Sequence, residues 1–344
     1  MAPTVKQIAE MAQVSAATVS LALNNKPGVS PATRQRVLAI AETLSKENGS
    51  QSFRPLSKGS IRFLKIVKHS HILNRDHDVF IAAYNEGIDK EARRHGCNLE
   101  ITHITIDQVD DFISHLNSSS SKGLIVLGTE LNARDILAFE NVNVPIVVID
   151  TTFDFIDFDF VDMNNTEALF QIIRYFRDNN HRDIGLIWSE DVQVRNFELR
   201  RLAFEQAVKY YELPFNPRNI LSVDSTFNDA YQGTLQHLKR GLELPTALFS
   251  ANDLIASACI KAFKESGIRV PEDVSVIGFD NLPMCEMLDP PLTTMNVSKQ
   301  QIGAMAAQLL IRRIGQNEGA PTLKVSIGGK LVIRKSVQRL PQAP

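Results

Sequence analysis

The 344-residue sequence predicts an α/β protein with a small helical N-terminal head and a larger body of parallel β-sheets flanked by helices. Three observations support this prediction. In the first 46 residues, apolar side chains recur at helical spacing. From residue 61 onward, short apolar, β-prone runs alternate with amphipathic stretches. A Ser- and Gly-rich segment that is poor in apolar residues lies between the two parts and is expected to be a linker.

The beginning of the head predicts two short helices joined by a tight turn. Apolar residues between Val5 and Ala12 recur three and four apart, and Thr4 can cap this first helix. Ser15 can cap a second helix, in which Val19 and Leu23 form the buried stripe. Helices separated by so few residues must cross steeply, as in a helix-turn-helix whose second helix lies in the major groove of DNA. The alternative is an amphipathic hairpin that packs on another domain.

A third helix and the charge distribution favour the DNA-binding interpretation. Ser30 can cap this helix, Pro31 suits its first position, and Val37 and Leu44 lie on its apolar face. Residues 1 to 62 carry a net charge of +5, whereas the rest of the chain carries −7. A basic head attached to an acidic body is attracted to a polyanion by release of counterions from its phosphates.

The body predicts more strands than one doubly wound sheet needs, so we expect two sheets with a ligand cleft between two lobes, at the carboxyl ends of the strands. The predicted strands are 63–67, 99–104, 124–127, 146–149, 184–188, 220–223, 247–250 and 274–277. The predicted helices include 80–95, 166–179, 198–211, 230–240 and 254–266.

Several classes of protein are disfavoured by composition. No apolar run reaches the roughly 20 residues of a membrane span, and no signal peptide is evident, so a soluble cytoplasmic protein is expected. Cys97, Cys259 and Cys285 are scattered, which indicates neither disulfides nor a zinc site. The loop 68–79 holds three His residues, but a polar loop at the cleft is a simpler interpretation than a metal site. We expect no metal and no cofactor.

The sequence resembles the lactose-repressor and purine-repressor (LacI/GalR) family of bacterial transcription regulators. The head, TVKQIAEMAQVSAATVSLALNNKPGVSPATRQRV, is similar to the family pattern almost position for position. Matches in the body follow in the family's order: GLIVLG from Gly123, VPIVVID to Asp150, NNHRDIGLI from Asn179, RRLAFEQA from Arg200, SAND to Asp253, GIRVPEDVSVIGFDN to Asn281, PPLTTM from Pro290 and LVIRKS to Ser336.

This resemblance implies a domain organisation and partners. Residues 1–46 would form the helix-turn-helix domain, 47–60 a hinge, and 61–344 an effector-binding and dimerisation body like that of periplasmic binding proteins. The implied lobes are about 61–163 with 293–323, and about 164–290 with 324–344. The family implies a homodimer on double-stranded operator DNA with two-fold symmetry, and a small effector in the cleft that alters DNA affinity.

The expected DNA contacts combine phosphate-binding and base-reading side chains. Hydroxyl and amide groups at helix starts can bind phosphates, and a cation can assist them. The predicted phosphate contacts are Thr4, Ser15, Thr18, Asn25, Ser30 and Arg34. The predicted base-reading positions are Ala16, Ala17, Ser20 and Leu21, where methyl contacts with thymine replace bidentate guanine contacts. In the hinge, Leu56 best matches the family's minor-groove wedge.

The expected effector site combines charged, amide and aromatic side chains. The family positions that line the cleft fall on Phe80, Asp150, Met163, Arg200, Phe227, Asn252 and Asp280. Charged groups and an aromatic face suit a hydroxyl-rich ligand, so a sugar or sugar derivative is favoured and a nucleobase is the alternative. A purely structural interpretation would have Asn252 and Asp280 cap turns after strands.

The function expected from the residues and the resemblance is a sequence-specific DNA-binding transcriptional regulator, a repressor controlled by a small effector. A free-standing solute-binding or enzymatic protein of similar fold is the competing hypothesis. No nucleophile with a partnered base, phosphate-binding Gly loop or metal set stands out in the sequence, so an enzyme is not expected.

Overall fold

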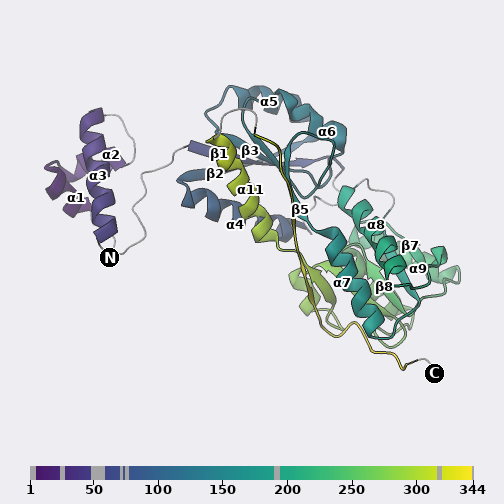
Figure 1. Ribbon diagram of the computed structural model, residues 1–344. Helices are drawn as coiled ribbons and strands as arrows, with labels where there is room; N and C mark the ends of the chain where they lie inside the picture. Colours follow the sequence, from purple (N-terminus) through teal and green to yellow (C-terminus); the bar gives the residue numbers. More distant parts are fainter. Residues whose placement is uncertain are drawn as a thin grey trace.

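The computed structural model describes residues 5–23, 28–47, 59–69, 73, 77–189, 194–315 and 320–342. The head consists of α1 (Val5–Ala12), α2 (Ala16–Leu23) and α3 (Pro31–Glu47), which pack on one another (Figure 1). Ile8, Val19 and Val37, one from each helix, are fully buried in the shared core. The predicted head of three helices around one small core is therefore present.

Local sequence signals explain where these helices begin. Ser15 Oγ accepts a hydrogen bond from the backbone N–H of Thr18 at 3.0 Å, and Ser30 Oγ accepts from Thr33 N–H at 3.2 Å. Both predicted N-caps that lie in the described residues are thus confirmed. Gln13, in the turn between α1 and α2, has a φ of 52°, a left-handed conformation that lets the chain reverse within a few residues.

The body contains one six-stranded sheet in each of two lobes (Figure 1). In lobe 1 the strand order is β11-β5-β4-β3-β1-β2, and every neighbouring pair is parallel. These strands are β1 (Gly59–Val67), β2 (Cys97–Thr105), β3 (Gly123–Leu127), β4 (Ile146–Ile149), β5 (Asp159–Met163) and β11 (Lys324–Ile327). The helices of lobe 1 are α4 (Asp78–Arg94), α5 (Val109–Asn117), α6 (Ala133–Leu137) and α11 (Lys299–Ile314).

Lobe 2 repeats this arrangement with the order β12-β10-β9-β8-β6-β7, in which only the β10–β12 pair is antiparallel. Its strands are β6 (Ile184–Trp188), β7 (Ile220–Ser222), β8 (Ala247–Ser250), β9 (Ser275–Asp280), β10 (Thr293–Asn296) and β12 (Lys330–Val332). Its helices are α7 (Asn165–Asp178), α8 (Arg195–Tyr210), α9 (Phe227–Lys239) and α10 (Asp253–Glu265). Short 3-10 turns occur at Ile106–Gln108, Ala138–Asn141, Pro217–Asn219 and Pro283–Glu286.

The chain passes between the lobes three times, and two predicted boundaries need correction. The first passage is at Asn164, between β5 and α7. Residues from 293 were expected in lobe 1, but β10 pairs with β9 in lobe 2, so this passage comes only after Asn296. Residues from 324 were expected in lobe 2, but β11 pairs with β5 in lobe 1 before the last passage. Both strands mix polar and apolar residues, with the sequences TTMN and KVSI, so no apolar pattern indicates the sheet to which each belongs.

Two glycines bring helices α4 and α11 of lobe 1 into backbone contact, and these helices lie side by side in Figure 1. A Cβ atom on Gly87 would lie 2.1 Å from the Gln300 carbonyl oxygen, and one on Gly303 would lie 2.2 Å from the Tyr84 carbonyl oxygen. Only glycine permits this approach. The contact fixes Tyr84, whose side chain reaches the cleft.

Candidate DNA-binding face and effector cavity

Helix α2 presents its predicted DNA-reading side chains on the surface of the head. Ser15, Ala16, Ala17 and Ser20 are exposed, whereas Thr18 and Leu21 are half-buried. Ser30 is exposed and Arg34 is half-buried at the start of α3. Thr4, Asn25 and Leu56 lie outside the described residues. Small side chains therefore dominate the exposed part of α2, and the DNA contacts of these residues stay predictions.

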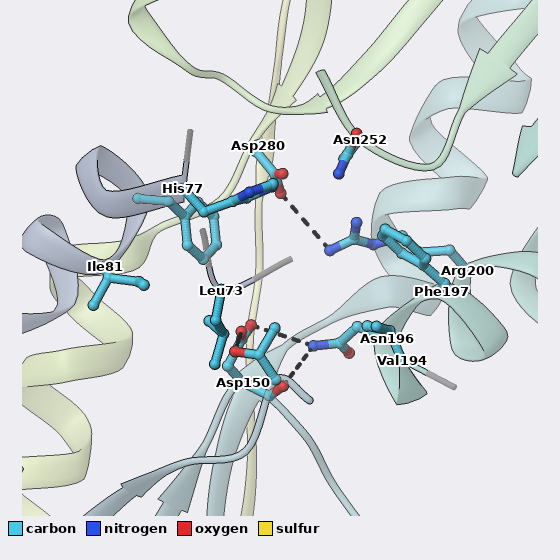
Figure 2. A pocket seen from close by; sticks show the side chains of 12 residues that line it. Leu73, His77, Ile81, Asp150, Val194, Asn196, Phe197, Arg200, Asn252 and Asp280 are labelled. Atoms are coloured by element: carbon cyan, nitrogen blue, oxygen red, sulfur yellow. Dashed lines mark hydrogen bonds and ion pairs between the residues drawn. The ribbon is translucent and has the colours of Figure 1, made fainter. Parts of the chain in front are cut away.

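A cavity of about 30 Å³ lies between the lobes, and the unfilled space around it amounts to about 410 Å³ when the part open to solvent is counted. Figure 2 shows charged and amide side chains from both lobes around it. The lining residues are Leu73, His77, Phe80, Ile81, Thr129, Asp150, Val194, Asn196, Phe197, Arg200, Asn252 and Asp280. Its position at the carboxyl ends of parallel strands is where α/β sheets bind ligands.

Asp150, which follows β4, is fully bonded. Its Oδ1 accepts from Tyr84 Oη at 3.0 Å, its Oδ2 accepts from the Thr129 hydroxyl, and Asn196 Nδ2 donates to its backbone oxygen at 3.0 Å. Burial raises the pKa of Asp150, while these donors and the nearby Arg200 lower it. The backbone φ of Asp150 is 62°, in the left-handed region that non-glycine residues rarely adopt. Such strain is typical of functional positions.

Asp280, the last residue of β9, is equally buried but poorly bonded. Its φ is 112°, and its Oδ1 has no hydrogen-bond partner within the described part of the chain. Arg200 Nη2 is 3.7 Å from this oxygen, a distance that leaves room for a ligand oxygen to improve the contact. Burial raises the pKa of Asp280 to about 7, although Arg200 opposes the shift.

Arg200 is held rigidly on α8. Nε donates to Asn165 Oδ1 at 3.1 Å and Nη1 donates to the Ala251 carbonyl oxygen at 2.5 Å. The guanidinium also stacks on Phe279, with its carbon 3.8 Å from the ring centroid. A buried arginine in this setting is preorganised, so a ligand does not have to order it.

Lys299 brings a second cation close to the cavity from the start of α11. Nζ donates to the Asp280 backbone oxygen and lies 5.0 Å from the centroid of the Phe80 ring. Burial lowers the pKa of Lys299, and the carboxylates of Asp280 and Asp253 oppose that change. The cation thus fixes the backbone of Asp280 and leaves the side chain free to face the cavity.

Five of the seven predicted cleft residues line the cavity: Phe80, Asp150, Arg200, Asn252 and Asp280. Asn252 also caps α10, because its Oδ1 accepts from Ile255 N–H at 2.8 Å, as the structural interpretation anticipated. Met163 is not in the lining and instead places its sulfur 2.9 Å from Arg200 Nη2. Phe227, at the first turn of α9, is not in the lining either and lies 5.9 Å from Lys261 Nζ.

Sequence reasoning missed several lining residues, notably Asn196, Thr129 and His77. Asn196 was accessible to prediction, because it precedes Arg200 by four residues and therefore lies on the same face of α8. Thr129 and His77 lie on segments whose direction no local pattern specifies. Among the described residues, no group of three His, Cys, Asp or Glu side chains is arranged to hold a metal ion. No described helix is long and apolar enough to cross a bilayer.

Comparison with protein families gives two matches. Residues 4–45 match the model described as bacterial regulatory proteins, lacI family, and residues 173–337 match that of a periplasmic binding protein-like domain. The chain is 31% identical over 343 residues to the HTH-type transcriptional repressor PurR of Histophilus somni (strain 129Pt), covering 98% of this chain and 99% of that protein. It is 29% identical over 339 residues to the PurR repressor of Pasteurella multocida (strain Pm70), covering 97% and 98%.

Solved structures share the fold along almost the whole chain. The complex of the transcriptional regulator CelR with cellobiose has a TM-score of 0.71 at 23% identity, covering 97% of this chain and 99% of that one. The lac repressor dimer bound to operator and the anti-inducer ONPF has a TM-score of 0.71 at 21% identity, covering 98% and 100%. A LacI family regulator from Enterococcus faecium with bound ribose has a TM-score of 0.68 at 21% identity, covering 82% and 100%.

Proposed function

As a member of the lacI family of bacterial regulatory proteins, this chain is a DNA-binding transcriptional repressor controlled by a small effector and not an enzyme, and we propose that the effector is a neutral, hydroxyl-rich molecule such as a sugar. The observation that carries this proposal is the pair formed by Asp280 Oδ1 and Arg200 Nη2. An acceptor and a donor 3.7 Å apart match two neighbouring hydroxyl groups, one of which donates while the other accepts.

The charge around the cavity supports a neutral ligand. Asp150 and Asp280 line it, and the only charged nitrogen in the described lining, apart from the titratable His77, belongs to Arg200. Each nitrogen of Arg200 already has a protein partner, because Nε and Nη1 donate to protein oxygens and Nη2 donates to the Met163 sulfur. A phosphate would therefore meet carboxylates rather than free cations, whereas hydroxyl groups can donate to them. Phe80 and Phe197 offer apolar surface for the CH face of a ring.

The ligand class is tested by calorimetric titration of the full chain with glucose, ribose, ribose 5-phosphate and hypoxanthine. We expect heat of binding with at least one neutral sugar and none with the phosphate ester. In Asp280→Asn, sugar affinity should fall at least tenfold, because a neutral amide accepts more weakly than a carboxylate and has one acceptor oxygen instead of two. Tight hypoxanthine binding without sugar binding would replace the sugar proposal by the nucleobase alternative.

For DNA recognition, we propose that the predicted residues of the head contact the operator and that the chain acts as a homodimer inside the cell, where the operator lies. The lac repressor, solved as a dimer bound to operator, supports this proposal. The exposed methyl groups of Ala16 and Ala17 suit thymine, and Arg34 suits a phosphate.

Binding to fragments of neighbouring genomic DNA tests this proposal. Removal of residues 1–60 should abolish operator binding. Arg34→Ala should weaken specific and non-specific binding alike and lower the log-log salt slope by about one. Arg36→Ala is the matched control, and Ala17→Gln should alter base preference without changing the slope. An unchanged slope in Arg34→Ala would remove Arg34 from the phosphate contacts.

A further inference from the structure

Behind the effector cavity, a series of hydrogen bonds runs in one direction. Arg200 Nε donates to Asn165 Oδ1 at 3.1 Å, and Asn165 Nδ2 donates to Asn196 Oδ1 at 2.7 Å. Asn196 Nδ2 then donates to Asp150 Oδ1 at 3.3 Å and to Asp162 Oδ1 at 3.2 Å. Arginine can only donate and an ionised carboxylate can only accept, so the two ends determine the orientation of both amides.

This relay crosses the boundary between the lobes. Asn165 lies on α7, and Asn196 and Arg200 lie on α8, all in lobe 2. Asp150 and Asp162 belong to lobe 1 and occur after β4 and within β5. None of the five residues is more than 5% exposed. Hydrogen bonds between buried groups strengthen one another and are costly to leave unmade, so the relay resists separation of the lobes.

The acceptor end of the relay has too few donors. One amide nitrogen serves two carboxylates, and Asp162 Oδ2 is buried with no hydrogen-bond partner among the described residues. Oδ1 of Asp162 receives the Met163 N–H at 2.8 Å in addition to Asn196. An ionised Asp162 would leave charge on Oδ2 with no donor to stabilise it. A proton on that oxygen removes the charge without disturbing the bonds to Oδ1.

The electrostatic surroundings agree with this geometry. Burial and the charge of Asp150 raise the pKa of Asp162 to about 7, while Met163 N–H, Asn196 and Arg200 oppose the shift. Tyr84 on α4 also faces the pair, and burial together with both carboxylates raises the pKa of its hydroxyl, which therefore stays protonated. Asp280 lies on lobe 2 and Lys299 lies at the start of α11. Their charges shift the pKa values of each other, and Asp162 is not among the main causes of either shift.

We propose that this relay is a latch between the lobes and that Asp162 acts as a positioning residue whose protonation keeps the latch closed. Separation of the lobes would let water reach Asp162 and return its pKa toward the ordinary aspartate range. Closure must then bind a proton. The closed form is favoured below neutral pH and loses this advantage as pH rises through about 7. The biological role of the latch rests on the proposed effector function, whereas the latch itself needs neither effector nor DNA.

The test measures the distance between the lobes in the full chain. One spin label is attached to each lobe, through Ser120→Cys in lobe 1 and Gln236→Cys in lobe 2, because both positions are exposed. The native residues Cys97, Cys259 and Cys285 are buried, so the label should react with the two introduced cysteines. Between pH 6 and pH 8, the ratio of closed to open molecules should fall by about tenfold in total, as one proton with a pKa of about 7 requires. Asp162→Asn, a neutral isostere, should remain closed at both pH values. Asp154→Asn, an exposed neighbour, is the matched control and should behave like the parent.

Two further measurements keep the proposal falsifiable. Asn196→Ala should favour the open form at both pH values, and a selectively labelled Asp carboxyl carbon that titrates near neutral pH should disappear from the spectrum of Asp162→Asn. A parent without a pH-dependent distance, or an Asp162→Asn variant that keeps the full pH response, would overturn the latch. Either result would leave operator and effector binding by the parent, measured separately, unaffected.

Discussion

The two lobes place an aspartate at the same point of the same strand order and then surround it differently. Asp150 follows β4 and Asp280 ends β9, each the fourth strand counted from the β2 or β7 edge of its sheet. Both have positive φ angles, and both are buried. The oxygens of Asp150 are bonded by Tyr84 and Thr129, whereas Asp280 Oδ1 has no hydrogen bond in the described structure. Hydrogen-bond satisfaction, rather than place in the fold, separates a structural carboxylate from a ligand-binding one.

The largest effect should follow loss of the bonded carboxylate. Asp150→Ala leaves the hydroxyl groups of Tyr84 and Thr129 without this acceptor and removes one of the three acceptors of Asn196 Nδ2, so the free energy of unfolding should fall by about 3–5 kcal/mol. Urea denaturation measures it, with the exposed Asp154→Ala as control. Asp280→Ala should cost less than half as much. Equal losses at the two positions would show that the lobes do not differ in this way.

The next effect concerns the cation that faces the unsatisfied carboxylate. Arg200→Ala removes a rigid donor from the cavity, and effector affinity should fall by about 2–4 kcal/mol, the range for a desolvated charge-assisted contact. Operator binding without effector should persist. The adjacent Arg201→Ala is the matched control, because that side chain pairs with Glu205 at 2.7 Å instead of facing the cavity. An affinity within about threefold of the parent would make Arg200 a purely structural residue.

A smaller effect should follow removal of one donor from Asp150. Tyr84→Phe deletes the hydroxyl that lies 3.0 Å from Asp150 Oδ1 and leaves the ring in place. We expect a loss of about 1.5–2 kcal/mol in unfolding free energy, since hydrogen bonds to charged groups exceed neutral ones. Thermal and urea unfolding of Tyr84→Phe and of the exposed Tyr210→Phe make the comparison. No loss would mean that the remaining donors satisfy Asp150 without the Tyr84 hydroxyl.

The smallest effect is a pH dependence from Asp280. Its pKa is raised to about 7, so the folded protein holds a proton that the unfolded chain has already lost, and stability falls as pH rises toward and through that value. One such group accounts for about 1 kcal/mol between pH 6 and 8. Asp280→Asn should remove this share of the fall, as urea midpoints at several pH values would show. An unchanged slope would mean that Asp280 is ionised throughout.

The head and most of the body could be predicted because their signals are local. The caps at Ser15 and Ser30, the apolar spacing in α1 and the continuous apolar strands each depend on neighbours in sequence. Strands β10 to β12 were missed because each contains polar residues, with the sequences TTMN, KVSI and KLV, and so none shows the continuous apolar run that revealed the other short strands. Strand β5, with the sequence DFVDM, pairs with β4 and β11 despite its two carboxylates.

Part of the cleft could be predicted, because the topology determines where the strands end. The contacts between side chains of different elements do not follow from the topology. Asp150, Asn252 and Asp280 follow or end strands, so their convergence could be expected. Asp162 looked like one acid in an aromatic run, and nothing in its neighbourhood indicates that Asn196 reaches it from the other lobe. Phe227 was placed in the cleft by family position alone, and it lies outside the cavity lining.

The three passages between the lobes are also tied to one another. Asn164 N–H donates to the Ile327 carbonyl oxygen at 2.8 Å, and Ser298 Oγ donates to the Gly328 carbonyl oxygen at 3.0 Å. A single covalent connection would let the lobes swivel about any axis, and two would still permit twisting. Three connections that are hydrogen-bonded side by side restrict twisting and favour rotation of the lobes about a single hinge axis. Whatever the chemistry of the effector, its binding would then be transmitted to the head as a change in one quantity, the angle between the two lobes.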